Sequence, residues 1–229
     1  VDDYCFYGCE NLKTVTFLEN TVKGKTATIN AFALTGCGVK TLNLSSTVTN
    51  LDNQTMDGGH PDLLEINVAD GNPKYKVVEG MLYSHDGKTL VLAPNGIHDL
   101  EIPEGTRSIG TRAFEGTDID RVKMIPSVIS IGAFAFKDSK LTEVDFDECP
   151  VTIGQESFGN TLLTHVEIPM GCKVSYRSFY DCKQLLTVHM DGEFYDNRGS
   201  AFGSCINLAS FTLGENFTDP YGYAKNHAP

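Results

Sequence analysis

The sequence predicts a solenoid, a stack of short repeated units that is mostly β-structure and carries a ribbon of parallel strands. The first observation is that IGTRAFEGTDIDRVKM (109–124) and IGAFAFKDSKLTEVDF (131–146) begin 22 residues apart and share four of their first six residues. The second is that both halves of this unit recur along the chain. The third is energetic: one unit buries side chains worth roughly 9–18 kcal/mol, whereas ordering its backbone costs on the order of 20–40 kcal/mol. A unit therefore folds only when neighbours share its apolar layer.

The second half of the unit is an apolar residue, two variable residues, an apolar residue, one variable residue and a third apolar residue. This alternation predicts a short strand with one buried face. Copies are 22, 22, 22, 22 and 23 residues apart from Ile97 onward, and 27, 24 and 34 apart before it, so the N-terminal half carries insertions. Nine such strands would make one ribbon ~40 Å long. The nine copies are Leu12-Val15-Phe17, Val39-Leu42-Leu44, Leu63-Ile66-Val68, Ile97-Leu100-Ile102, Ile119-Val122-Met124, Leu141-Val144-Phe146, Leu163-Val166-Ile168, Leu185-Val188-Met190 and Leu208-Phe211-Leu213.

The first half of the unit places an apolar residue five positions before a large apolar one, as in Ile109/Phe114 and Ile131/Phe136. Apolar and polar residues do not alternate in this half, and Gly follows Ile. We therefore expect a turn and then an irregular or single-turn helical segment. The last copy keeps Phe202 but has Asn197 at the earlier position. A small residue precedes most of the large ones, which predicts a close passage of backbone at that level; these are Cys5, Ala33, Ala113, Ala135, Ser157, Ser178 and Ala201.

One insertion has a structure of its own. YKVVEGMLYSHDGKTLVLAP (75–94) has the pattern of two strands around a turn at His85-Asp86-Gly87. We expect a β-hairpin that projects from the solenoid in place of the loop half of one unit. It is either a structural patch at an irregular repeat or a recognition element.

The segments SVISIGAFAFKDSKLTEVDF (127–146), FYGCENLKTVTF (6–17) and GNPKYKVVEGMLYSHDGKTLVLAPNG (71–96) resemble the BspA-like, or Treponema-type, leucine-rich repeat family. The resemblance covers residues 1–217 and leaves 218–229 as a C-terminal tail or cap. It implies an α/β-class leucine-rich repeat solenoid, a right-handed horseshoe with the strand ribbon on the concave face and short irregular or helical turns on the convex side. It also implies export to a bacterial surface and adhesion or protein–protein contact rather than catalysis.

Charge and hydropathy limit the partners. The chain has 30 Asp and Glu against 18 Lys and Arg, a formal charge of −12. This excludes nucleic acid, whose phosphates need a positive field, and disfavours anionic membrane surfaces. The sequence contains no run of 18 apolar residues, which is the length needed to span a bilayer. We expect an extracellular or cell-surface monomer whose partner is a protein, either of the host extracellular matrix or of another cell surface.

Four of the seven cysteines share one position, three residues after the large apolar residue: Cys9, Cys37, Cys182 and Cys205. Thr117, Ser139 and Thr161 hold this position elsewhere, so we interpret these cysteines as small wall residues. Cys149 and Cys172 lie in turns of adjacent units and could pair. The cysteine and histidine spacings fit no zinc site, and no nucleophile–base pair is apparent. We therefore expect no cofactor, no metal and no enzymatic activity.

The residues between the apolar strand positions should face outward together and form the candidate binding surface. They are Thr and Asn at the N-terminal end and charged in the middle. This strip is either cross-strand charge compensation on a solvated sheet or a docking strip for a basic protein or peptide. His165 and His189 fall at diagonal positions, where a surface cation site is an alternative to ordinary titrating histidines. The candidate partner-binding residues are Asp99, Glu101, Arg121, Lys123, Glu143, Asp145, His165, Glu167 and His189.

The alternative function is glycan binding. The outward strand positions carry no aromatic residue on which a sugar ring could stack, and Tyr221 and Tyr223 of the tail are the remaining candidates. The chain opens inside a unit, at VDDYCFYGCENL. Since a solenoid needs a polar cap, we expect residues before Val1 in the full protein.

Overall fold

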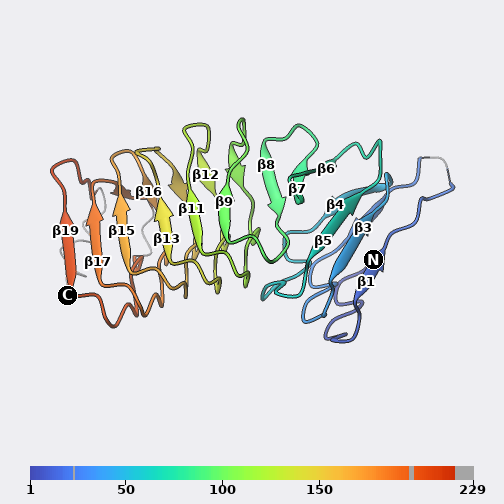
Figure 1. Ribbon diagram of the computed structural model, residues 1–229, viewed down its shortest axis with the longest axis horizontal. Coiled ribbons are helices and arrows are strands. Elements are labelled where there is room, and N and C mark those ends of the chain that lie inside the picture. The colour runs from blue at the N-terminus through green and yellow to red at the C-terminus, as the bar shows by residue number, and fades with distance from the viewer. Residues whose placement is uncertain (23, 196–198, 220–229) are drawn as a thin grey trace.

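The structure, a computed structural model, describes residues 1–22, 24–195 and 199–219. They form an elongated stack of about eight turns with a strand on each long side (Figure 1). The strands predicted from the sequence form one side, which we call the strand face. Every predicted copy is present: β1 Thr14–Thr16, β3 Thr41–Leu44, β5 Glu65–Val68, β9 Asp99–Glu101, β11 Arg121–Lys123, β13 Glu143–Asp145, β15 His165–Ile168, β17 Thr187–Met190 and β19 Ser210–Leu213.

The strand face is not one continuous ribbon, contrary to the prediction. It consists of three parallel sheets of three strands, ordered β1-β3-β5, β9-β11-β13 and β15-β17-β19. Within each sheet the central apolar residues align, as Val122 does with Leu100 and Val144. Val166 continues the same buried core in β15, although β15 pairs with β17 and not with β13. The predicted interior row is therefore present, whereas hydrogen bonding between strands stops twice along it.

The opposite side carries further strands, of which the sequence predicted only those of the inserted segment 75–94. The N-terminal pair is β2 Ala27–Ile29 with β4 Val48–Leu51, and the remainder form an eight-stranded sheet. They are β6 Tyr75–Val78, β7 Met81–Ser84, β8 Thr89–Leu92, β10 Ser108–Ile109, β12 Ser130–Ile131, β14 Thr152–Ile153, β16 Lys173–Val174 and β18 Glu193–Phe194. Five of these strands have two residues, and in β10, β12, β14 and β16 the second is the Ile or Val that opens the IGxxAF-type segment.

The loop after each of these strands is a series of turns, and the described residues contain no helix. The α/β class and the helical turns predicted above are therefore wrong, and the irregular alternative is correct. The physical reason is that every second amide of these loops bonds to the neighbouring loop, while the amides between them form single turns within their own loop. The amide of Phe114 donates to the carbonyl of Ala135 and that of Phe136 to Ser157, both at 2.7 Å. Arg112 and its equivalents in the stack adopt positive φ, which interrupts helical geometry.

The small residue before each large one has the predicted role. Ala113, Ala135, Ser157 and Ser178 are fully buried, and their carbonyls face the neighbouring loop. The glycine after the strand is needed for the same reason: a Cβ on Gly154 would lie 2.6 Å from the carbonyl oxygen of Ile131. At Gly110, Gly132 and Gly154 successive units approach too closely for a side chain.

The large residues of the regular units form a column of stacked rings, which we call the aromatic column. Consecutive rings are 5.0–5.2 Å apart and within 10° of parallel. An offset stack of this spacing adds about 0.5–1.5 kcal/mol per pair beyond burial. The column consists of Phe114, Phe136, Phe158, Phe179 and Phe202.

The inserted segment forms the predicted antiparallel pair around residues 85–87, namely β7 with β8, and β6 adds a third strand. It does not project, contrary to the prediction. β8 pairs in parallel with β10, so the insertion is the end of the eight-stranded sheet. Its apolar side chains explain this placement: Tyr83 and Leu90 pack into one core, while Leu82 and Leu92 pack into another. The insertion thus divides the interior into an N-terminal core and a C-terminal core.

Three residues singled out from the sequence, Asn197, Tyr221 and Tyr223, lie outside the described residues. Across the residues that are described, no helix has the length and apolar character to cross a membrane.

Candidate functional site

The strand face is built by the alternation of β-strands. In each three-residue strand the central side chain is buried and its neighbours are exposed, as in Arg121-Val122-Lys123. All nine residues predicted to bind a partner are exposed on this face, on β9, β11, β13, β15 and β17.

Charges in the middle sheet compensate one another across strands. Arg121 lies opposite Asp99 and Glu143 in the register, and its Nε is 3.9 Å and 3.6 Å from their carboxylates. Lys123 Nζ lies 3.7 Å from Asp145 and 3.3 Å from Asp147. Asp147 is the main cause of the raised pKa of Lys123. These side chains are about half exposed or more, so the pairs are solvated and contribute little to stability.

The two histidines of the C-terminal sheet are bound locally. His165 Nδ1 lies 2.7 Å from the hydroxyl of Thr187, and His189 Nε2 lies 3.3 Å from Asp191. The register puts His189 opposite Glu167 and makes it the diagonal neighbour of His165, as predicted. Within the described ranges, no three His, Cys, Asp or Glu residues are grouped so that they could hold a metal ion. The arrangement does not favour the cation-site alternative.

An open groove of about 850 Å³ lies where the middle and C-terminal sheets separate, between β13 and β15. At the entrance of these strands Leu162 still donates to the Leu141 carbonyl, at 2.9 Å, but no strand pairing follows. Val144, Phe146 and Ile168 contribute apolar lining. The acidic lining residues are Glu143, Asp145, Asp147, Glu148, Glu167 and Asp191.

This acidic groove brings together some of the predicted site residues and not others. Besides Glu143, Asp145 and Glu167, its lining includes Arg121, His165 and His189, whereas Asp99, Glu101 and Lys123 lie outside it. Sequence reasoning missed Asp147, Glu148 and Asp191 because they follow the strands rather than lying in them. The signal that could have found them is the acidic turn in FDECP and the Asp of MDGE, each at the exit of a strand.

Two of the six carboxylates form no ion pair within the described part of the chain. Glu148 and Glu167 form no ion pair with any residue that the structure describes, whereas Arg121, Lys123 and His189 lie beside the other four. The groove thus has unbalanced negative charge above apolar lining. An arrangement of this kind attracts cationic groups and accommodates their apolar stems.

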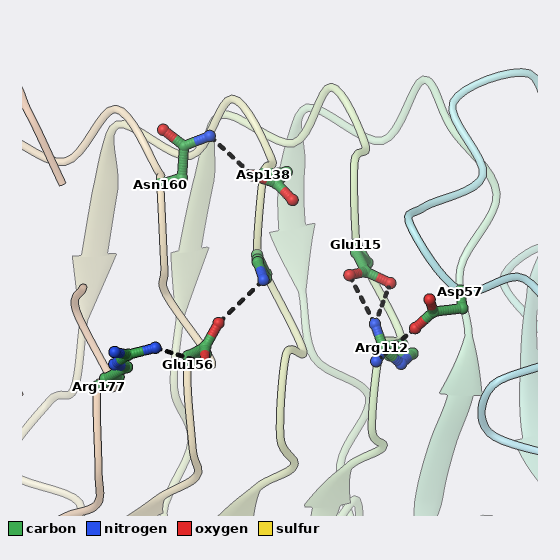
Figure 2. Close-up of polar contacts among 8 residues, drawn as sticks. Asp57, Arg112, Glu115, Asp138, Glu156, Asn160 and Arg177 are labelled. Carbon is green, nitrogen blue, oxygen red and sulfur yellow. Dashed lines mark hydrogen bonds and ion pairs between the residues drawn. The ribbon is translucent and has the colours of Figure 1, made fainter. Parts of the chain in front are cut away.

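A second set of charges lies on the loops beside the aromatic column (Figure 2). Glu156 bonds Lys137 at 2.9 Å and lies 4.0 Å from Arg177. Arg112 binds both carboxylate oxygens of Glu115, at 2.7 Å and 2.8 Å, and lies 2.5 Å from Asp57. Burial raises the pKa of Glu115, and Arg112 opposes that rise. These residues connect neighbouring units and were not predicted from the sequence.

The cysteines are all free, including Cys149 and Cys172, the candidate pair. Burial raises the pKa of Cys172 to about 11, so its thiol is a poor nucleophile. In the shared position, Cys182 and Cys205 are buried as predicted, whereas Cys9 is exposed. The buried thiols donate to the carbonyl of a large residue one unit earlier, Cys182 to Phe158 at 3.0 Å. Thr161 and Ser139 bond the carbonyl three residues before them in their own unit.

Solved structures similar to this chain are bacterial leucine-rich repeat proteins. A leucine-rich cell surface protein from Faecalibacterium prausnitzii superposes with a TM-score of 0.74 at 22% identity, over 91% of this chain and 62% of its own. The pneumococcal vaccine antigen PcpA gives 0.71 at 21% identity, over 88% of this chain and 51% of its own. A leucine-rich repeat protein from Eubacterium ventriosum gives 0.64 at 21% identity, over 94% and 58%. The chain thus spans between half and two thirds of the length of these proteins, and the likeness shows the fold alone.

A search of curated proteins gave no match. The family model described as the BspA type leucine rich repeat region matches in six copies, over residues 1–68 and 93–209. The unmatched stretch contains the inserted strands β6, β7 and β8. The match covers most of the sequence and agrees with the repeat found in it. The chain belongs to the BspA-type leucine-rich repeat family.

Proposed function

We propose that this domain is an extracellular or cell-surface adhesion module that binds a basic, extended segment of a partner protein in the acidic groove. The observation that carries the proposal is the groove itself, which places six carboxylates above apolar lining on the strand face. Lys and Arg side chains suit such a site because their heads would meet the carboxylates and their stems the apolar surface. The family and its similar structures support a surface location and an interaction role in general terms. We also propose, from the family, that the domain is curved like a horseshoe with the strand face on its concave side.

The groove favours a protein partner over a glycan. Its lining contains one aromatic residue, Phe146, which is buried at 2% exposure. Sugar recognition on an open surface needs an exposed ring, whereas recognition of a basic chain needs charge and length. The charges also make the interaction sensitive to salt, because exposed ion pairs are screened beyond about 10 Å at 0.1 M ionic strength.

The test compares binding of Lys- and Arg-rich peptides, and of acidic and neutral peptides of equal length, to the whole domain by biolayer interferometry. Basic peptides should bind selectively and lose affinity as salt is raised. The double substitution Glu148→Gln with Glu167→Gln should weaken binding about tenfold, equivalent to about 1.4 kcal/mol. These two carboxylates have no ion pair among the described residues, so neutralising them removes no such contact there.

The matched control is Glu101→Gln with Glu104→Gln, which neutralises two exposed carboxylates outside the groove lining. It should leave affinity within about twofold, a difference of roughly 0.4 kcal/mol. Equal losses in the two variants would show that net charge, and not the groove, attracts the peptide. Preference for neutral or acidic peptides would refute the proposal.

A further inference from the structure

Two histidines line the acidic groove among its six carboxylates. His165 lies on β15 and His189 on β17, and both are exposed. Histidine is the side chain whose charge ordinarily changes between pH 5 and 8, whereas exposed carboxylates and arginine ordinarily keep their charges over that range. Mild acid therefore adds positive charge to this groove and leaves its negative charge in place.

The groups around His165 come from three strands. Glu143 holds the equivalent position on β13, one unit earlier, and Glu167 lies two residues further along β15 on the same face. On β17 the register places the uncharged Thr187 opposite His165, with its hydroxyl 2.7 Å from Nδ1. A hydroxyl group both donates and accepts, so it can bond the ring in either charge state. Protonation of His165 thus requires no rearrangement of this contact.

His189 has a carboxylate on each of two sides and an uncharged residue on the third. Glu167 lies opposite it on β15, and Thr212 lies opposite it on β19. Asp191, at the exit of β17, places its Oδ2 3.3 Å from Nε2. The side chain of His189 is 46% exposed, so the ring is open to solvent protons. Its protonation compensates Asp191 and Glu167, and Glu167 is one of the two groove carboxylates without an ion pair among the described residues.

The other charges of the groove lie on β13, on the turn after it and on β11. Asp145 belongs to β13, Asp147 and Glu148 to the turn, and the guanidinium of Arg121 to β11. Among the described lining residues, six carboxylates and this guanidinium give a formal charge of −5 with neutral histidines and −3 with both protonated. The attraction of the groove for a cationic segment falls with that charge.

From this arrangement we propose that the acidic groove is a pH-dependent site, which holds a basic segment at neutral pH and releases it in mild acid when His165 and His189 take up protons. The inference rests on the proposed function, because it requires a basic partner in the groove. Linkage makes the effect reciprocal: a partner that binds the neutral histidines more tightly must displace their protons. Binding within the titration range of histidine therefore releases protons to the buffer.

The test is isothermal titration calorimetry of the whole domain with an acetylated, amidated peptide of Arg and Ser residues. The charge of this peptide is constant because arginine stays protonated. Its affinity should fall about fivefold between about pH 7.5 and about pH 5.5, since each solvent-exposed charge contributes a small factor. Titrations at about pH 6.5 in buffers of different ionisation enthalpy should show proton release on binding.

Two double variants assign the effect to the histidines. His165→Gln with His189→Gln should bind within about twofold at the two pH values and release no protons. His165→Lys with His189→Lys fixes the positive charge, and at neutral pH it should bind as weakly as the wild type does in mild acid. The matched control is His85→Gln with His98→Gln, which changes two exposed histidines outside the groove lining and should keep the full pH dependence.

The outcomes separate this inference from the proposed function. Equal affinity at the two pH values, or a Gln variant of His165 and His189 that keeps the pH dependence, overturns the inference and leaves the proposed function in place. No binding at any pH refutes both. The buried His60 is unchanged in every variant, so acid unfolding through His60 would affect all of them alike and could not produce the expected difference.

Discussion

The N-terminal and C-terminal cores differ in how regularly their units stack. In the C-terminal core the units repeat every 22 residues or nearly so, five phenylalanine rings stack, and the opposite sheet runs without a register shift from β10 to β18. In the N-terminal core the equivalent large residues are Phe6, Leu34 and Met56, and β2 pairs with β4 through a register shift.

The difference teaches that side chains stack where consecutive units all carry a ring at the same position. The N-terminal loops are in the same register, since the amide of Leu34 donates to the carbonyl of Thr55 at 2.9 Å, but Leu34 and Met56 stand there in place of rings. The N-terminal units compensate on the strand face, where Asn43 bonds the hydroxyl of Thr16 at 3.0 Å and Asn67 bonds Asn43 at 2.9 Å. Side-chain hydrogen bonds thus connect neighbouring units in the N-terminal half, as stacked rings do in the C-terminal half.

The largest effect that tests this comparison is expected in the aromatic column. Phe136 is fully buried and stacks on a ring on each side, 5.0 Å and 5.2 Å away. Phe136→Ala should lower the free energy of unfolding by about 4 kcal/mol, as cavity formation adds to lost burial and stacking. Met56→Ala, at the same position of the N-terminal core, should cost about 2 kcal/mol, because Met56 makes no ring stack and is 8% exposed. Urea unfolding of the two variants measures both values, and equal losses would contradict the comparison.

A pH effect at the junction of the two cores comes next. Burial lowers the pKa of His60 from 6.5 to about 4, so between these values the unfolded chain binds a proton that the folded chain does not. Stability should therefore fall as pH drops from 6.5 to 4, by up to about 3 kcal/mol. Glu115 acts in the opposite sense: its raised pKa stabilises the folded state at low pH, and that contribution is lost as pH rises through its folded pKa.

The measurement is the difference in unfolding free energy between wild type and His60→Gln across this range. The variant keeps Glu115 and should show a flatter acid limb. His98→Gln is the control, since His98 lies exposed on the C-terminal side of the junction. A variant as acid-sensitive as wild type would place the proton uptake elsewhere.

The strand face could be predicted from the sequence, whereas features that form only through contacts between neighbouring units could not. Residues such as Val122 and Val144 could be predicted as buried because strand alternation is written directly in the pattern. The two-residue strand Ser108–Ile109 carries no alternation, and only pairing with its neighbours makes it a strand. The acidic groove depends on an interruption between β13 and β15 that no change of spacing marks. The hydrogen bond from the His60 amide to the Glu115 carbonyl joins residues 55 positions apart, and it forms because the inserted strands bring their two loops together.

The smallest effect is expected on the strand face, in the sheet β9-β11-β13. Lys123 bridges Asp145 and Asp147, and its side chain is 60% exposed. Lys123→Met should leave the urea midpoint unchanged within error, since the charges are already hydrated in the folded state. At an ionic strength of roughly 1 M the variant and the wild type should still have the same urea midpoint, because screening removes what remains of the ion pair. Arg107→Met, at an exposed residue, serves as the control. A loss as large as that of Phe136→Ala would mean that these charges hold the sheet together, whereas indifference means that the strand face is free to exchange its ion pairs for those of a partner.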